Sequence, residues 1–219
     1  MGRNAAEAAV TFTLITNAYD EKDLHRSAEY QVCLARNLEL SHFDRVVVVY
    51  EAGGVYAPLA HPKLTVERIG KRGTFAEYFA IANRLSGGPR VVLANADIYF
   101  DDTLGLLEQR ELKGLICLSR WDVLPDGSST MMSIPDSHDA WIFRTPFNLP
   151  KCDFTFGVPG CDGRIAWLAN QARMPLSNPA RSVRANHLHQ SGVRHYTELH
   201  RLRGQYQSVW ATELSVIPR

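Results

Sequence analysis

Short apolar runs rich in β-branched residues recur through the first half of the chain and predict four strands. The second run contains four consecutive valines with no polar residue between them. Such a run is typical of a strand that is buried on both faces of a parallel sheet. The predicted strands span Val10–Thr16, Arg45–Tyr50, Lys63–Ile69 and Arg90–Ala94.

Two longer amphipathic segments lie between these strands and predict helices over Asp23–Leu40 and Thr74–Ser86. The second begins with a threonine, which is a good N-cap, and two glycines follow its end. Strands that alternate with helices predict an α/β fold with a doubly wound, mostly parallel central sheet flanked by helices. The apolar positions of the first helix are Leu24, Ala28, Val32, Ala35 and Leu38.

The second half of the chain is less regular and has a polar loop at Asp126–Ser137. There is no internal repeat and no break in composition, so we expect one domain over residues 10–196. A flexible N-terminus (1–9) would precede it, and a C-terminal helical extension (197–219) would pack on or near it. The elements predicted here are strands at Gly114–Ser119, Asp139–Phe143 and Arg181–His187, and helices at Asp162–Ala172 and Tyr196–Trp210.

Composition narrows the class of protein without naming a function. The chain has 219 residues, of which 45% are hydrophobic and 21% are charged, as in an ordinary globular domain. Its net charge of +1 gives no overall attraction to nucleic acid or to an anionic membrane. The four cysteines show no Cys-x-x-Cys spacing, and no apolar run approaches the roughly 20 residues that cross a bilayer. We therefore expect a cytoplasmic protein with reduced thiols, at most peripheral to a membrane.

A polar cluster follows the predicted strand Arg90–Ala94 directly. In doubly wound sheets ligands bind at the carboxyl ends of the strands, which is where Asp97 would lie. A carboxylate at this position can hold a hard divalent cation. Asp101 or Asp102, by contrast, is well placed to cap a helix that begins near Thr103.

Two further segments carry side chains that suit a metal or a phosphate. His187 and His189 lie on the same side of an extended chain, so one of them could complete a metal site with Asp97. Arg194 could contact a phosphate with two hydrogen bonds. Arg72 lies in a basic segment before a predicted helix, which suits an anion or nucleotide contact.

Asp162 lies in the first turn of a predicted helix, just after Pro159 and Gly160. The helix dipole favours a negative charge there. The residue could be an N-cap and nothing more, or it could act as a base over a bound acceptor.

Taken together and in this order, these segments resemble the GT-A glycosyltransferases, and more narrowly the family-two-like enzymes. Leu14–Tyr19 resembles the opening strand and nucleotide loop, and Asn95-Ala96-Asp97 resembles the Asp-x-Asp metal motif. Gly160 followed by Cys161-Asp162 resembles the glycine and Glu-Asp pair of the acceptor helix. His187 or His189 matches the late histidine that ligates the metal. The chain departs from the family at Asn95 and Cys161, where the motifs carry carboxylates.

The resemblance implies an enzyme that transfers a sugar from a nucleotide-diphosphate sugar, with UDP as the expected nucleotide, to an acceptor hydroxyl. Asp162 would be the general base of an inverting displacement, and Asp139 is its rival for that role or for binding the sugar. Mn²⁺ or Mg²⁺ would bind at Asp97, His187 and His189. The acceptor would be a glycan, a lipid-linked glycan, a protein or a modified DNA base. The residues expected to contact the donor are Thr16, Asn17, Ala18, Tyr19, Arg72, Phe75, Asn95, Ala96 and Arg194.

Three other functions are compatible with an α/β fold and a strand-end aspartate. A sugar nucleotidyltransferase would need a glycine-rich basic loop after the first strand, whereas the chain has Asn17-Ala18-Tyr19-Asp20. A metal-dependent hydrolase would need ligands beyond Asp97, His187 and His189. A non-catalytic nucleotide-sugar-binding module of the same fold would explain Asn95.

Overall fold

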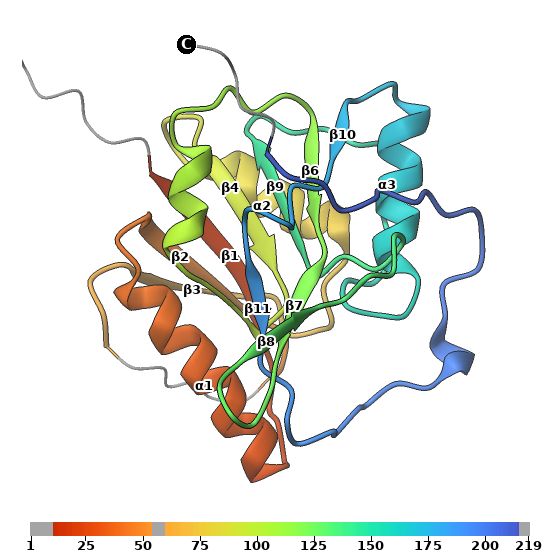
Figure 1. Cartoon of the computed structure of the whole chain (residues 1–219). Coiled ribbons are helices and arrows are strands. Elements are labelled where there is room, and N and C mark those ends of the chain that lie inside the picture. Colours follow the sequence, from red (N-terminus) through yellow and green to blue (C-terminus); the bar gives the residue numbers. More distant parts are fainter. Residues whose placement is uncertain (1–10, 54–59, 215–219) are drawn as a thin grey trace, which may run out of the picture.

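A computed structural model describes residues 11–53 and 60–214, so the expected flexible N-terminus (1–9) lies outside the described residues. A seven-stranded sheet forms the centre, with helices on both of its faces (Figure 1). The fold is therefore a mixed α/β domain with a large, mostly parallel central sheet flanked by helices, as predicted. No helix among the described residues is long and apolar enough to cross a membrane.

The six elements predicted for the first half are all formed. Strand β1 ends two residues later than predicted, because Asn17 and Ala18 continue the pairing with β2. Asp23 and Thr74 cap the two helices, and Thr74 forms a reciprocal capping box with Glu77. The elements are β1 (Phe12–Ala18), α1 (Leu24–Glu39), β2 (Phe43–Tyr50), β3 (Leu64–Arg68), α2 (Phe75–Arg84) and β4 (Arg90–Ala94).

The central sheet has the strand order β10-β6-β9-β4-β1-β2-β3. Strand β1 pairs in parallel with β2 and β4, and β2 pairs in parallel with β3. Strand β9 is antiparallel to both β4 and β6. The other strands of this sheet are β6 (Leu115–Leu118), β9 (Ala140–Arg144) and β10 (Leu176–Ser177), and the helix α3 (Cys161–Gln171) packs on one of its faces.

The valine run of β2 shows why the strands lack polar alternation. Val47 and Val49 pack in the cluster formed with α2 and α3, whereas Val46 and Val48 pack in the cluster on the other face. All four side chains are buried. The apolar run thus follows from burial on both faces, as the sequence predicted.

A second, four-stranded sheet with the order β5-β11-β7-β8 lies beside the first. It was mostly missed from sequence, because β8 lies inside the predicted polar loop and β7 is only partly buried. Strand β11 lies between β5 and β7, which places His187 opposite Ile98 and Asp122. Asp101 caps the short helix η1 (Asp102–Leu107), as expected for Asp101 or Asp102. The four strands are β5 (Ile98–Phe100), β7 (Arg120–Val123), β8 (Ser129–Met131) and β11 (Ala185–His187).

The C-terminal helical extension is not formed in the part that the structure describes. Between 197 and 214 the only helix is the single 3-10 turn η2 (Glu198–His200). The backbone beyond it bonds to the domain instead of to itself. For example, Gln207 N donates to Gly163 O at 3.0 Å and Val209 N donates to Pro135 O at 2.7 Å. These contacts bring the segment across α3, and they replace the internal hydrogen bonds of a helix.

Candidate functional site

A cavity of about 830 Å³ opens beside the carboxyl ends of β1 and β4 and the N-terminus of α3. Its position is the one expected for a ligand site in a doubly wound sheet. Most of the residues predicted from sequence line it, although they come from distant parts of the chain. Those residues are Asn17, Tyr19, Arg72, Asn95, Ala96, Asp97, Asp139, Asp162, His187, His189 and Arg194.

Three predicted donor contacts lie elsewhere and leave the candidate set. Thr16 is buried within β1. Ala18 packs against the core at the end of the same strand. Phe75 is fully buried, with its ring centroid 5.0 Å from that of Trp141, because the first turn of α2 faces the core. None of the three lines the cavity.

Glu51, which follows β2, was missed from sequence. Its carboxylate accepts hydrogen bonds from several segments that surround the cavity. It is buried, and it accepts hydrogen bonds from Gly73 N at 2.8 Å and Tyr78 Oη at 3.0 Å. Asn17 Nδ2 donates to the other carboxylate oxygen at 3.4 Å, and Asn17 Oδ1 accepts from Ala96 N at 3.1 Å. The end of β1, the segment before α2 and the segment after β4 are therefore held in one network.

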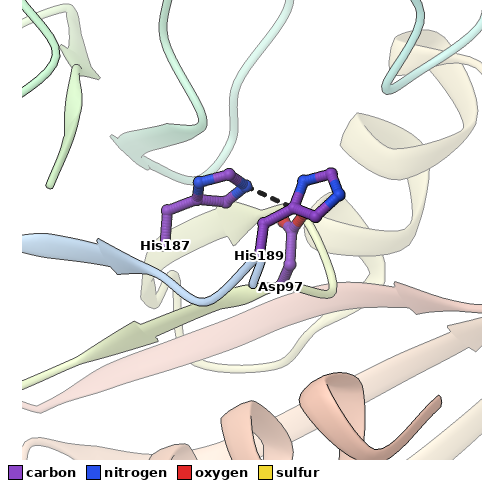
Figure 2. Close-up of side chains that lie close together, drawn as sticks. All are labelled: Asp97, His187 and His189. Atoms are coloured by element: carbon purple, nitrogen blue, oxygen red, sulfur yellow. Dashed lines mark hydrogen bonds and ion pairs between the residues drawn. The ribbon is translucent and has the colours of Figure 1, made fainter. Parts of the chain in front are cut away.

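Asp97 is a buried carboxylate at the carboxyl end of β4 (Figure 2). Its Oδ2 accepts from Arg26 Nη2 and lies 3.2 Å from His187 Nε2, whereas its buried Oδ1 has no partner among the described residues. Burial by itself would raise the pKa of Asp97. The charges and hydrogen bonds of His187 and Arg26 outweigh burial and hold the pKa of this carboxyl well below its usual range. Asp97 is thus ionised at neutral pH.

The two histidines differ in the direction of their pKa shifts. His187 Nδ1 donates to Asp122 Oδ1 at 2.7 Å. Burial lowers the pKa of His187, but the carboxylates of Asp97 and Asp122 outweigh burial and raise the pKa to about 9. His189 Nε2 donates to the carbonyl of Val193 at 2.9 Å, which leaves its Nδ1 as an acceptor. Burial, together with the charges of Arg26 and His187, lowers the pKa of His189.

These side chains form the one group among the described residues with the composition and spacing of a metal site. One ligand atom from each of Asp97, His187 and His189 lies within 4.8 Å of the others. One carboxylate oxygen and imidazole nitrogens make a donor set that Mn²⁺ or Zn²⁺ accepts. The unpartnered Oδ1 of Asp97 is a buried acceptor suited to a cation. The three residues therefore fit a divalent ion, provided that His187 Nε2 loses its proton when the ion binds while Nδ1 keeps its hydrogen bond to Asp122.

Arg26 reaches this group from α1 and was also missed from sequence. The predicted apolar face of α1 was wrong except at its end: Leu38 is buried, but Leu24 is 83% exposed and Val32 is 41% exposed. The face that is buried carries Arg26 and Glu29, at a spacing of three residues. The only sign of this buried face in the sequence was the pair of opposite charges one helical turn apart, a pattern that usually indicates an exposed ion pair.

A charged network connects Asp97 to Asp139. Arg120, on β7, donates from Nε to Asp122 Oδ1 at 2.8 Å and from Nη1 to Asp139 Oδ2 at 3.0 Å. Asn95 Nδ2 donates to Asp139 Oδ1, also at 3.0 Å. Both carboxylate oxygens of Asp139 are therefore engaged. Arg120 and Asp122 had no signal in the sequence, because β7 was not predicted.

Asp162 also lines the cavity, in the first turn of α3. Within residues 11–53 and 60–214, its one side-chain hydrogen bond outside that turn is with His138 N, which donates to Oδ2 at 3.2 Å. Burial, and then the nearby charge of Asp139, raise the pKa of Asp162 to about 7. A carboxyl with this pKa exchanges a proton readily at neutral pH. The neighbouring Cys161 packs in the core.

Three buried side-chain polar atoms have no hydrogen-bond partner within the described residues. They are Asp97 Oδ1, His138 Nδ1 and Trp141 Nε1, and all three residues line the cavity. Buried polar groups in folded proteins are nearly always hydrogen-bonded. Their concentration at one cavity favours a polar ligand there.

Comparison with solved structures finds a neighbour for this fold. The mannosyltransferase PcManGT from Pyrobaculum calidifontis, solved in complex with GDP-mannose and Mn²⁺, is 18% identical with a TM-score of 0.55. The match covers 84% of this chain and 58% of the neighbour, so this chain spans well under two thirds of that protein's length. No protein-family model and no curated protein matches the sequence. The chain thus has the fold of a known glycosyltransferase.

Proposed function

We propose that the chain is a glycosyltransferase that moves a sugar from a nucleotide-diphosphate sugar to an acceptor hydroxyl. The observation that carries the proposal is a single cavity lined both by the group of Asp97, His187 and His189 and by Asp162. The first group suits a diphosphate with its cation, and the second suits a base. The neighbour's complex with GDP-mannose and Mn²⁺ supports this pairing of fold and ligand.

The donor would lie with its diphosphate beside Asp97. Asp97, His187 and His189 would hold Mn²⁺ or Mg²⁺, and a bound ion would offset the charge that develops on the leaving diphosphate. Arg72 and Arg194 line the same cavity and would contact the phosphates. The sequence resemblance favours a uridine donor and the neighbour holds a guanosine donor, so both nucleotides belong in the assay.

Asp162 suits the general base better than Asp139 does. Both carboxylate oxygens of Asp139 are already engaged, by Asn95 and Arg120. Asp162 would take the proton of the acceptor hydroxyl, and the acceptor oxygen would bond to the anomeric carbon. The bond from that carbon to the diphosphate oxygen would break, with inversion at the carbon. Asp139 would then orient Asn95 and Arg120, the two residues that donate to it.

A non-catalytic binding module is the second candidate, because Asn95 stands where the family motif carries an aspartate. The structure offers a different reason for that residue. Asn95 Nδ2 donates to Asp139 Oδ1 at 3.0 Å, and an aspartate at position 95 would place two carboxylates in contact. Asn95 is therefore compatible with catalysis in this cavity.

The test is release of nucleoside diphosphate from UDP- and GDP-sugars, with Mn²⁺ or EDTA, on a panel of glycan, lipid-linked, protein and DNA acceptors. Asp162→Asn should lower kcat by about 10²–10⁴ while donor binding is kept. Full turnover by a folded Asp162→Asn protein would exclude the base. An EDTA-insensitive rate would exclude an essential metal, and binding without turnover on any acceptor would favour the binding module.

A further inference from the structure

Arg26 is a fixed positive charge within the proposed donor site. Its side chain is 6% exposed. Besides the contact with Asp97, its Nη1 donates to Glu29 Oε2 at 2.8 Å and to Leu188 O at 3.2 Å. Its Nε donates to Tyr30 Oη at 2.9 Å. These four contacts involve all three nitrogens of the guanidinium and hold it in place beside Asp97.

Glu29 anchors this arrangement to the segment that carries the histidines. Its Oε1 accepts from Gln190 N at 2.6 Å and Ser191 N at 2.7 Å, and its Oε2 accepts from Ser191 Oγ at 2.9 Å. The chain just after His189 is therefore tied to α1 through the same ion pair that fixes Arg26. A side chain in this position has little freedom to withdraw when a ligand enters.

Arg26 also faces the cavity. Its Nη2 carries two N–H groups and makes one contact among the described residues, with Asp97. A guanidinium with a free N–H at a cavity wall suits a phosphate oxygen. The same charge repels a divalent cation at Asp97, because both would share one carboxylate.

We propose that Arg26 is the resident cation of the diphosphate subsite, so that the chain binds a nucleoside diphosphate without a divalent ion and binds the free ion weakly. The role of Arg26 in binding the diphosphate rests on the proposed function, whereas the weak binding of the free ion does not. A divalent ion then adds to Arg26 in catalysis and is not needed for donor binding.

The first experiment measures binding of GDP and UDP by titration calorimetry, in EDTA and in Mn²⁺. In the wild-type protein the affinity should change by less than about three-fold between the two conditions. Arg26→Gln should weaken binding in EDTA by roughly ten-fold or more, and Mn²⁺ should restore it. Wild-type affinity of Arg26→Gln in EDTA would overturn the proposal.

Asp97→Asn is the matched variant and does not depend on how well Arg26→Gln folds. It removes the carboxylate that neutralises Arg26, so nucleoside diphosphate should bind as tightly as to the wild type or more tightly, with no effect of Mn²⁺. If Asp97 instead acted through a metal that binding requires, this variant would lose binding. That loss would also overturn the proposal.

The second experiment titrates Mn²⁺ alone, by electron paramagnetic resonance, and needs no donor. Arg26→Gln should bind Mn²⁺ at least about ten-fold more tightly than the wild type, whereas Arg26→Lys, which keeps the charge, should not. Equal or weaker Mn²⁺ binding by folded Arg26→Gln, or tighter binding by Arg26→Lys, would contradict the role of Arg26. If neither nucleotide binds any variant, the proposed function and the diphosphate role fail together, and this titration still decides whether Arg26 weakens ion binding.

Discussion

The pKa of Asp162 predicts how the rate should depend on pH. Burial and the charge of Asp139 raise this pKa to about 7, and only the ionised carboxylate can accept the acceptor's proton. At pH 6 about one tenth of the carboxyl is ionised and at pH 8 about nine tenths, so kcat/KM should rise about ten-fold between them. An ordinary aspartate, with a pKa of about 4, would be fully ionised across this range.

The assay is the initial rate of nucleoside diphosphate release from pH 5.5 to 8.5 at constant ionic strength. In Asp162→Asn the inflection should disappear, and the rate should be lower by a factor of about 10²–10⁴. Asp139→Asn is the control, because it removes a negative charge near Asp162 and should move the inflection to lower pH. An inflection near pH 4, or one that persists in Asp162→Asn, would refute the assignment of the base.

Three further predictions concern the stability of the fold. Because the folded pKa of Asp162 is raised, the native state holds a proton that the unfolded chain releases, so stability falls as pH rises from about 4 to 7. Asp162→Asn should therefore melt above the wild type at pH 8 and close to it at pH 4. Thr74→Ala removes the capping box of α2 and should cost about 0.5–2 kcal/mol in urea unfolding. Gly114→Ala should cost more than about 1 kcal/mol in the same assay, because Gly114 has φ +72° and a Cβ would lie 2.1 Å from Pro175 O.

The central sheet could be predicted from sequence because its strands are buried on both faces. Arg90–Ala94 was predicted with its observed bounds, and the valine run of β2 was correctly interpreted. The small sheet could not be predicted in this way. Its strands β7 and β8 are short and only partly buried, so they lack a continuous apolar run. The helix predicted over Tyr196–Trp210 is not formed for a different reason: the backbone of that segment bonds to the domain and not to itself.

The site was predictable where a residue follows a strand or begins a helix, as Asp97 and Asp162 do. Their separation of 65 positions is closed by the topology of the sheet and the position of α3. Arg26 was not predictable, because its partners Asp97 and Leu188 lie 71 and 162 positions away. A polar residue on a buried helix face is recognised only when the groups that satisfy it are known.

The most direct test of the central claim is a crystal structure of the chain with a non-hydrolysable UDP- or GDP-sugar. We predict that the diphosphate lies beside Arg26 and the group of Asp97, His187 and His189. The sugar should lie between the diphosphate and Asp162, with room for an acceptor oxygen against that carboxylate. A nucleotide sugar bound elsewhere on the molecule, or one bound in this cavity with its sugar directed away from Asp162, would contradict the claim.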